Sequence, residues 1–248
     1  MTKIISILNH KGGTGKTTST INIGACLARA GKKVLLIDID PQTNLTEGLG
    51  VYDTEESIYD SLRENTPLPI QKINDNLDLV PSSLDLVAIE MELISAHARE
   101  LKIKVLLDPI KDQYDYILFD CPPSLGLLTI NALVPSHSVL IPLQAEYFAY
   151  RGVDRMVGII NDMREYFNPN LDVEGVFLTK HKPNLILGRN IKDEIEKVFE
   201  DKLFNTYIRE NVSLAEAQTL GMDIFTHAPD SNGAKDYQNL VNEILNIG

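Results

Sequence analysis

The stretch IISILNHKGGTGKTTS, residues 4–19, carries the strongest structural signal in the chain. It begins with a β-rich apolar run at residues 4–8, which predicts a short strand. Glycines then interrupt the run, and from Thr17 onward the residues again suit a helix. The order strand, glycine-rich loop, helix predicts a loop that lies between the end of a strand and the start of a helix.

The chemistry of this loop predicts a nucleoside triphosphate site. Gly12, Gly13 and Gly15 lack side chains that would keep the backbone away from a ligand, so successive N–H groups can turn toward phosphate oxygens. The helix that follows points the positive end of its dipole at the same place. Lys16 supplies a charge for the β- and γ-phosphates, and the Thr17 hydroxyl suits a Mg²⁺ ion that bridges them. The expected nucleotide-binding residues of the loop are Lys11, Gly12, Gly13, Thr14, Gly15, Lys16, Thr17 and Thr18.

One position of the loop departs from the strict phosphate-loop pattern. That pattern, G-x-x-x-x-G-K-[ST], would place glycine at position 10, where this chain has His10, followed by a second lysine, Lys11. The resulting run KGGTGKTT, residues 11–18, resembles the deviant-Walker ATPases, specifically the ParA/Soj partition family. The resemblance implies that Lys11 reaches across a nucleotide-bridged dimer to the phosphates of the partner. The alternative is a solvated loop lysine that helps to hold phosphate within its own subunit.

Acidic residues follow two further apolar runs. Residues 33–38, KVLLID, predict a strand that is buried on both faces, and Asp40 follows at its carboxyl end. Residues 116–120, YILFD, give the Walker B arrangement, in which the Asp120 carboxylate holds Mg²⁺ directly or through water. Because ligands bind at the carboxyl ends of parallel strands, we expect both acids to face the phosphate loop. The predicted metal-binding residues are Thr17, Asp40 and Asp120.

Composition narrows the class of protein. The chain has 248 residues, 44% of them hydrophobic and 23% charged, which is ordinary for a globular protein and long enough for a covered central sheet. Its net charge of −12 argues against broad electrostatic attachment to DNA or anionic lipid, although a local basic patch could exist. The two cysteines form no C-x-x-C pair, and no signal peptide or apolar run near twenty residues is evident, so a cytoplasmic protein is expected.

Strand and helix patterns alternate along the chain. This order predicts an α/β fold, a mostly parallel central sheet with helices on both faces, in one domain spanning residues 1–248. Residues 43–50 are polar and punctuated by glycine, which predicts a mobile loop near the γ-phosphate. Further strands are predicted at residues 77–80, 137–143 and 173–179, and helices at residues 17–30, 55–65, 83–107, 124–133, 149–167, 191–199, 214–220 and 234–247.

The resemblance to the ParA/Soj family extends over nearly the whole chain. It is carried by five blocks in the expected order, KGGTGKTT, LLIDIDPQTNLTEGLG, YILFDCPPSLGLLTINAL, IPLQAEYFAYRGV and NVSLAEAQTLG. By this likeness Lys11 is the lysine that acts in trans, Lys16 and Thr17 are phosphate and magnesium ligands, and Asp120 is the Walker B acid. Asp40 would be the acid required for hydrolysis, oriented toward the attacking water. The alternative for Asp40 is an aspartate that caps or braces its loop. The implied catalytic residues are thus Lys11, Lys16 and Asp40.

The last of these blocks borders the adenine in the family. Asn211 matches the family pattern and is expected to contact the base, whereas Arg209 stands in the usual place of proline. Relatives that bind the nucleoid tend to have arginine or lysine where this chain has Glu210 and Ser213, which puts DNA binding in doubt. The basic residues that could compensate, or could simply be solvated, are Lys180, His181, Lys182, Arg189 and Lys192.

The function implied by the resemblance is a nucleotide-switched positioning ATPase. ATP would close a homodimer, and a ParB-like or other activating partner would stimulate slow hydrolysis during partition of a plasmid or chromosome. One alternative is the positioning of a protein cargo without direct DNA binding, and a more distant one is a reductase or cluster carrier, which would need cysteines that the chain lacks. A membrane-bound MinD-like protein is disfavoured because residues 236–248 contain no lysine or arginine.

Overall fold

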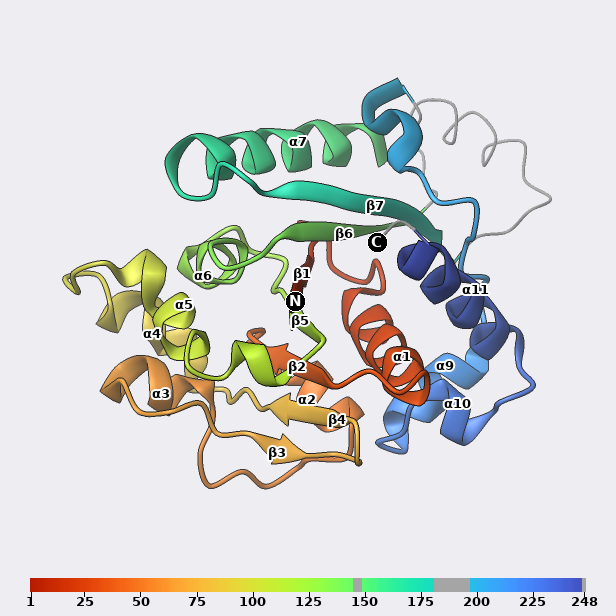
Figure 1. Ribbon diagram of the computed structural model, residues 1–248, viewed down its shortest axis with the longest axis horizontal. Coiled ribbons are helices and arrows are strands. Elements are labelled where there is room, and N and C mark those ends of the chain that lie inside the picture. The colour runs from red at the N-terminus through yellow and green to blue at the C-terminus, as the bar shows by residue number, and fades with distance from the viewer. Residues whose placement is uncertain (145–148, 181–196, 247–248) are drawn as a thin grey trace.

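A central sheet organises the computed structural model, which describes residues 1–144, 149–180 and 197–246 (Figure 1). The sheet has seven strands in the order β3-β4-β2-β5-β1-β6-β7, and all neighbours pair in parallel except β3 with β4. The predicted α/β fold with a mostly parallel sheet is therefore confirmed. The strands are β1 (Lys3–Ile7), β2 (Val34–Asp38), β3 (Gln71–Lys72), β4 (Leu77–Val80), β5 (Tyr116–Asp120), β6 (Ser138–Gln144) and β7 (Asp172–Thr179).

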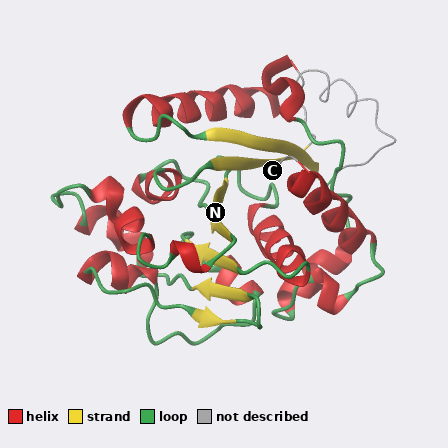
Figure 2. Cartoon of the chain, viewed as in Figure 1, coloured by secondary structure: helices red, strands yellow, loops and turns green. Residues whose placement is uncertain are grey.

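Helices cover both faces of the sheet (Figure 2). The α-helices are α1 (Lys16–Arg29), α2 (Asn44–Gly48), α3 (Ile58–Glu64), α4 (Leu86–Glu92), α5 (Lys102–Leu107), α6 (Leu127–Leu133), α7 (Ala149–Tyr166), α9 (Val212–Thr219), α10 (Ile224–His227) and α11 (Asn232–Asn246). Short 3-10 turns are η1 (Arg99–Leu101), η2 (Lys111–Gln113) and η3 (Glu200–Lys202). One face carries α1, α2, α9, α10 and α11, and the other carries α3 to α7 (Figure 1).

The two hydrophobic cores follow from the alternation of side chains along each strand. In β2, Val34 and Leu36 point into the core under α1 and α11, whereas Leu35 and Ile37 point into the core under α3 to α6. All four side chains are fully buried. This continuous apolar run is what a parallel strand between two helical layers requires.

Parallel pairing brings the carboxyl ends of the strands to one edge of the sheet. Ile7 at the end of β1 lies opposite Asp120 at the end of β5, and Asp38 at the end of β2 lies opposite Asp120 from the other side. The phosphate loop, the Asp40 turn and the segment after β5 therefore emerge next to one another. This edge is where the sequence places its candidate site.

Some predicted elements need correction. The helix predicted over residues 83–107 is interrupted, because Ala98 adopts a left-handed conformation with φ of 51°. Asn131 anchors the interruption, accepting from the Ile103 amide at 3.1 Å and donating to the Arg99 carbonyl at 2.8 Å. Residues 43–50, predicted as a loop, contain the short helix α2. The sequence does not predict β3 and α10, and residues 191–196 and residue 247, which belong to two predicted helices, lie outside the described residues.

Candidate functional site

The phosphate loop connects β1 to α1 and depends on glycine at two positions. Gly13 and Gly15 have φ of 75° and 89°, in the left-handed region that side chains disfavour. Gly15 is the N-cap of α1 and offers no side chain to the first-turn amides, so the loop leaves these donors for a ligand. The loop is braced at its start, where Asn9 donates to the Pro142 carbonyl at 2.7 Å and accepts from the Lys11 amide at 3.0 Å.

Lys16 folds back into the loop. Its side chain is buried, and Nζ donates to the Lys11 carbonyl at 3.4 Å. Thr14 is held by β7, because the Thr179 hydroxyl at the end of that strand donates to the Thr14 carbonyl at 2.8 Å. The ammonium group of Lys16 thus lies in the concave part of the loop, where a phosphate oxygen could replace the weakly bound carbonyl as its partner.

Thr17 and Asp120 meet at the centre of the site, as the sequence predicts. The Thr17 hydroxyl donates to Asp120 Oδ2 at 2.6 Å, and the Thr20 hydroxyl lies 3.4 Å from Asp120 Oδ1. Asp120 is fully buried, and this burial, together with the nearby Asp38 carboxylate, raises its pKa well above the ordinary value. The Thr17 hydroxyl and the Lys16 ammonium offset this rise only in part, and a bound cation would add the positive charge that the buried carboxylate needs.

Asp38 and Asp40 have different surroundings although both follow β2. Asp38 is fully buried and accepts from the Asp40 amide at 3.1 Å and from the Thr46 amide and hydroxyl at 2.9 and 2.7 Å. Burial raises the pKa of Asp38 to about 7. Asp38 therefore fixes the turn that leads to α2. Both oxygens of its carboxylate already accept hydrogen bonds from the protein, so they are poorly placed to bind a ligand.

The position of Asp40 is compatible with both interpretations that the sequence leaves open. Its Oδ1 accepts from the Gln42 amide at 3.0 Å, which braces the turn, and its side chain lines the same cavity as the phosphate loop. The Ser82 hydroxyl donates to the Asp40 carbonyl at 2.9 Å and fixes the backbone from β4. Asp40 is thus a loop-bracing residue with its carboxylate at the cavity wall.

The oxygens of Thr17 and Asp120 suit a magnesium ion that is also bound by water and phosphate, rather than a metal site made entirely of protein ligands. Among the described residues, no three His, Cys, Asp or Glu side chains converge as a set of metal ligands. Mg²⁺ usually needs only one or two protein oxygens and completes its shell with water and substrate phosphates. The adjacent oxygens of Thr17 and Asp120 beside the phosphate loop meet that requirement.

A cavity of about 890 Å³ extends from the loop to α9. This volume is within the range of small-molecule sites, and both predicted base-side residues, Arg209 and Asn211, line it. Asn211 also caps α9, accepting from the Ser213 amide at 2.9 Å. Arg209 pairs with Asp236, 2.6 Å from Nη2 to Oδ1. The residues that line the cavity are Gly12, Gly13, Gly15, Lys16, Thr17, Thr18, Asp40, Gln42, Asn44, Glu47, Gly48, Pro123, Thr179, Lys180, Ile208, Arg209, Glu210, Asn211, Val212, Leu214, Ala215, Gln218, Thr219 and Tyr237.

Two groups at the cavity were missed from the sequence. Gln218 of α9 accepts from the Thr18 hydroxyl at 2.9 Å, and the Tyr237 hydroxyl of α11 lies 3.0 Å from the Ser19 hydroxyl. Both join α1 to helices that follow it by about 200 residues, as the sequence numbers show. The terminal helix shows only an apolar periodicity in the sequence, so nothing there marks Tyr237 as part of the cavity.

The remaining predicted residues have mixed placements. Lys11 is exposed at the rim of the loop and is absent from the residues that line the cavity. Glu210 is exposed, and Ser213 is half-buried in the first turn of α9. Of the basic group, Lys180 lines the cavity, whereas His181, Lys182, Arg189 and Lys192 lie outside the described residues.

The cysteines and the helix lengths bear on the two alternative functions, a reductase or cluster carrier and a membrane-bound protein. Cys26 and Cys121 are free, buried and packed on opposite faces of the sheet, and burial raises the pKa of both thiols, for Cys26 to about 11. They offer no shared thiolate site within the protomer. Across the part of the chain that the structure describes, no helix has the length and apolar character needed to span a membrane.

The fold and the site define the class: a P-loop nucleoside-triphosphatase fold of the deviant-Walker type. A family described as AAA domain matches residues 2–173. The chain is 45% identical to the sporulation initiation inhibitor protein Soj of Bacillus subtilis, with all of both chains covered. It is 41% identical to the chromosome-partitioning ATPase Soj of Treponema pallidum, covering 99% of this chain and 98% of that protein. The chain belongs to the ParA/Soj family of partition ATPases.

A solved structure of an enzyme shows the same architecture. Cobyrinic acid a,c-diamide synthase from Mycobacterium smegmatis, with bound ATP analogue and magnesium, superposes with a TM-score of 0.88 at 29% sequence identity. The match covers 99% of this chain and 94% of that one. The shared fold thus extends beyond the phosphate loop to the cavity wall and the terminal helix.

Proposed function

We propose that this protein is an ATP-dependent dimerisation switch of the ParA type that positions DNA, a plasmid or chromosome, within the cell. ATP would bind between two copies of the chain, hydrolysis would be slow, and a ParB-like or other activating partner would accelerate it. The observation that carries the proposal is the contact of Thr17 with Asp120 beside the buried Lys16 and the start of α1, where no side chain caps the helix. The membership of the chain in a family of partition ATPases supports it.

The roles within one subunit follow from this geometry. The amides at the start of α1 and the Lys16 ammonium would bind the β- and γ-phosphates. Thr17 and Asp120 would hold Mg²⁺, which supplies charge neutralisation of the phosphates when it is bound. The M. smegmatis relative, which has both an ATP analogue and magnesium, supports this assignment. Asp40, held by the Gln42 amide at the cavity wall, would orient the attacking water and contribute to the metal shell.

The role of Lys11 depends on a second subunit. Its backbone closes the loop, with its carbonyl accepting from Lys16 and its amide bound to Asn9, while its side chain lies at the exposed rim. A side chain at the rim can extend toward a subunit that covers the cavity mouth. We expect the symmetric pair of Lys11 ammonium groups to bind the partner's phosphates and so to make dimerisation depend on ATP.

The deciding experiment measures mass in solution with ATP, Mg²⁺ and a variant that retains the nucleotide. Asp40→Ala should be a dimer with ATP and a monomer with ADP by light scattering after size exclusion. Adding Lys11→Ala to this variant should restore the monomer, whereas Lys104→Ala, at an exposed lysine of α5, should not. A monomer in ATP for Asp40→Ala, or rapid ATP hydrolysis without any partner, would contradict the switch.

A second candidate differs in the cargo. Positioning of a protein assembly without direct DNA binding is favoured by the exposed Glu210 next to α9 and by the net charge of −12. Either cargo would use the same nucleotide cycle. Retention on DNA in ATP across a salt series separates the two candidates.

A further inference from the structure

The cavity wall opposite the phosphate loop is formed by an irregular segment, residues 204–211, which we call the wall segment. Its last four residues, Ile208 to Asn211, line the cavity. On one side the segment follows β7, where the Phe204 amide donates to the Val176 carbonyl and the Ile208 amide to the Leu178 carbonyl, both at 2.8 Å. These two hydrogen bonds fix the wall segment against β7. The remaining backbone amides of the segment need hydrogen-bond partners from another element.

Two carboxylates on α11 supply those partners. Glu243 accepts from the Asn205 amide at 2.9 Å and from the Thr206 amide at 2.8 Å, and it also contacts the Thr206 hydroxyl. Asp236 accepts from the Arg209 amide at 3.0 Å. The two acids are about two helical turns apart, so both lie on the face of α11 that meets the wall segment.

Arg209 adds its side chain to the contact nearest the cavity. Nε lies 3.0 Å from Asp236 Oδ2 and Nη2 lies 2.6 Å from Oδ1, which is a two-pronged contact between guanidinium and carboxylate. The Asp236 side chain is only 7% exposed and that of Arg209 is 36% exposed. A carboxylate this buried needs its cation, so the pair fixes the backbone and the side chain of Arg209 together.

The same helix also contacts the phosphate-loop side of the cavity. Tyr237, the neighbour of Asp236, is fully buried, lines the cavity and places its hydroxyl 3.0 Å from that of Ser19 on α1. α11 thus bonds to α1 through Tyr237 and to the wall segment through Asp236. α11 therefore helps to set the separation between the triphosphate end and the opposite end of the cavity, together with β7 and α9, which also bond to both ends.

We propose that Arg209 and Asp236 form a positioning pair for the nucleoside end of the ligand. The pair holds residues 208–211 at the distance from the phosphate loop that a purine nucleotide requires, and it acts on nucleotide affinity and base selection rather than on hydrolysis. The inference rests on the proposed function, because it takes the ligand to be a nucleoside triphosphate whose phosphates occupy the loop.

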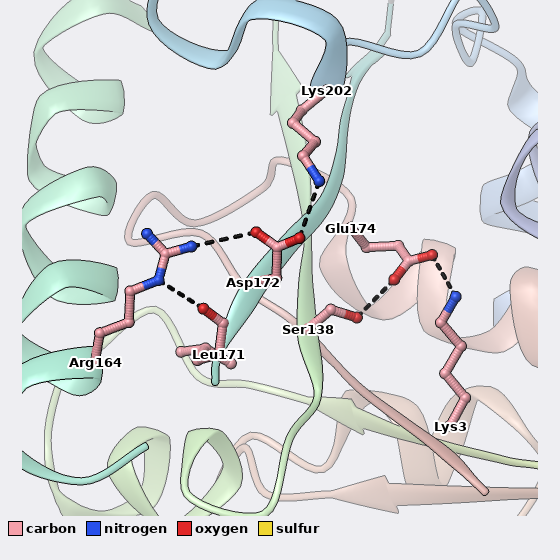
Figure 3. Close-up of polar contacts among 7 residues, drawn as sticks. All are labelled: Lys3, Ser138, Arg164, Leu171, Asp172, Glu174 and Lys202. Carbon is pink, nitrogen blue, oxygen red and sulfur yellow. Dashed lines mark hydrogen bonds and ion pairs between the residues drawn. The ribbon is translucent and has the colours of Figure 1, made fainter. Parts of the chain in front are cut away.

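The test compares Asp236→Asn with the same substitution at an ion-paired carboxylate remote from the cavity. Asp172 at the start of β7 also binds two cations, Arg164 Nη2 at 3.2 Å and Lys202 Nζ at 3.0 Å, as Figure 3 shows. It lies seven residues before Thr179, which is about 23 Å along the strand. Asp172→Asn therefore removes an ion-paired carboxylate, 57% exposed, far from the cavity, and it controls for the loss of a negative charge.

The measurements are the affinity for a fluorescent ATP analogue and KM and kcat for ATP and GTP, with circular dichroism to verify folding. For Asp236→Asn we expect binding of the ATP analogue weaker by about fivefold or more, a raised KM for ATP, a smaller preference for ATP over GTP, and kcat within about twofold. For Asp172→Asn we expect unchanged nucleotide binding, even if its melting temperature falls equally.

Each other outcome has a defined meaning. An unchanged KM in a folded Asp236→Asn protein, or a loss confined to kcat, overturns the positioning pair. If Asp236→Asn fails to fold, Arg209→Lys serves instead, because it keeps the charge and loses the two-pronged contact: an intermediate rise in KM supports the pair, and no change overturns it. Absence of nucleotide binding by the unsubstituted protein would overturn the proposed function itself, and the inference with it.

Discussion

The Thr17 hydroxyl is the residue-scale feature on which magnesium binding depends in this proposal. It lies 2.6 Å from Asp120 Oδ2, at the first turn of α1 and directly after Lys16. Thr17→Ala should weaken Mg²⁺-dependent ATP binding and hydrolysis by between about 10-fold and 100-fold. Thr17→Ser keeps the hydroxyl and should remain close to the unsubstituted protein. Titration of both variants with Mg²⁺ at fixed ATP makes the comparison, and equal behaviour of the two would show that the hydroxyl is not a ligand.

His137 gives a residue-scale prediction about pH. The Ile4 amide donates to His137 Nδ1 at 2.9 Å, so the contact requires the neutral ring. Burial, and then the positive charges of Lys111 and Lys3, lower the pKa of His137 below its ordinary value. The unfolded chain therefore binds this proton more readily, and the contribution to stability, present above about pH 6.5, is lost as the pH falls.

Thermal melts measure this contribution. His137→Asn provides an acceptor that does not titrate, so its melting temperature should fall less than that of the unsubstituted protein between about pH 8 and pH 5. Other acid-sensitive groups are common to the two proteins and cancel in the comparison. Parallel pH profiles would mean that His137 is not responsible.

The sequence predicts those site residues whose neighbours are set by a motif. Lys16, Thr17 and Asp120 come together because the loop, α1 and β5 have local signatures and parallel strands end at a common edge. Arg209 and Asp236 could not be paired in advance. Their contact depends on how α11 packs against the wall segment, and neither residue type indicates that partner by itself.

At the scale of elements, two glycines in neighbouring elements should respond in opposite ways to alanine. A Cβ on Gly175 in β7 would come within 2.3 Å of the Phe204 ring, whereas a Cβ on Gly158 in α7 would meet nothing within 4 Å. Gly175→Ala should destabilise the protein by about 1–3 kcal/mol through overpacking. Gly158→Ala should stabilise it by about 0.5–1 kcal/mol because alanine favours the helix. Denaturant unfolding provides both values, and a neutral Gly175→Ala would show that Phe204 can move aside.

Strands are predicted correctly where the sequence has a clear apolar run. Helix boundaries are predicted wrongly where tertiary contacts determine the backbone conformation. The apolar runs of β2 and β5 are continuous and end in aspartate, and those of β1 and β7 are only briefly interrupted, so the positions of these strands follow from the sequence. Residues 83–107 have helical periodicity throughout, yet the chain bends at Ala98, and Asn131 of α6 binds the backbone that follows the bend at Arg99 and Ile103. Short elements such as β3 and α10 are fixed by their neighbours and carry almost no signal of their own.

At the scale of the whole molecule, the topology gathers distant residues at one edge. The cavity combines the loop near the start of the chain, the Asp40 turn, the segment after β5 and the wall formed by α9 and residues 208–211. α11, near the end of the chain, forms hydrogen bonds with α1 on one side of this cavity and with Arg209 on the other. The last helix is therefore connected to the first. That the whole chain forms one domain stays a prediction, and an intact core after limited proteolysis would support it.

The whole-molecule charge leads to a prediction about DNA. With a net charge of −12 and an exposed Glu210 beside α9, the protein should bind DNA in ATP through few phosphate contacts, with a shallow dependence on salt. Ser213→Arg adds a cation in the first turn of α9 and should steepen the dependence of log affinity on log salt by about 0.9, the value for one added phosphate contact. Ser213→Gln, similar in polarity but uncharged, should leave the slope unchanged. Strong, steeply salt-dependent retention of the unsubstituted protein would instead favour direct attachment to DNA through basic residues elsewhere and would count against the protein-cargo candidate.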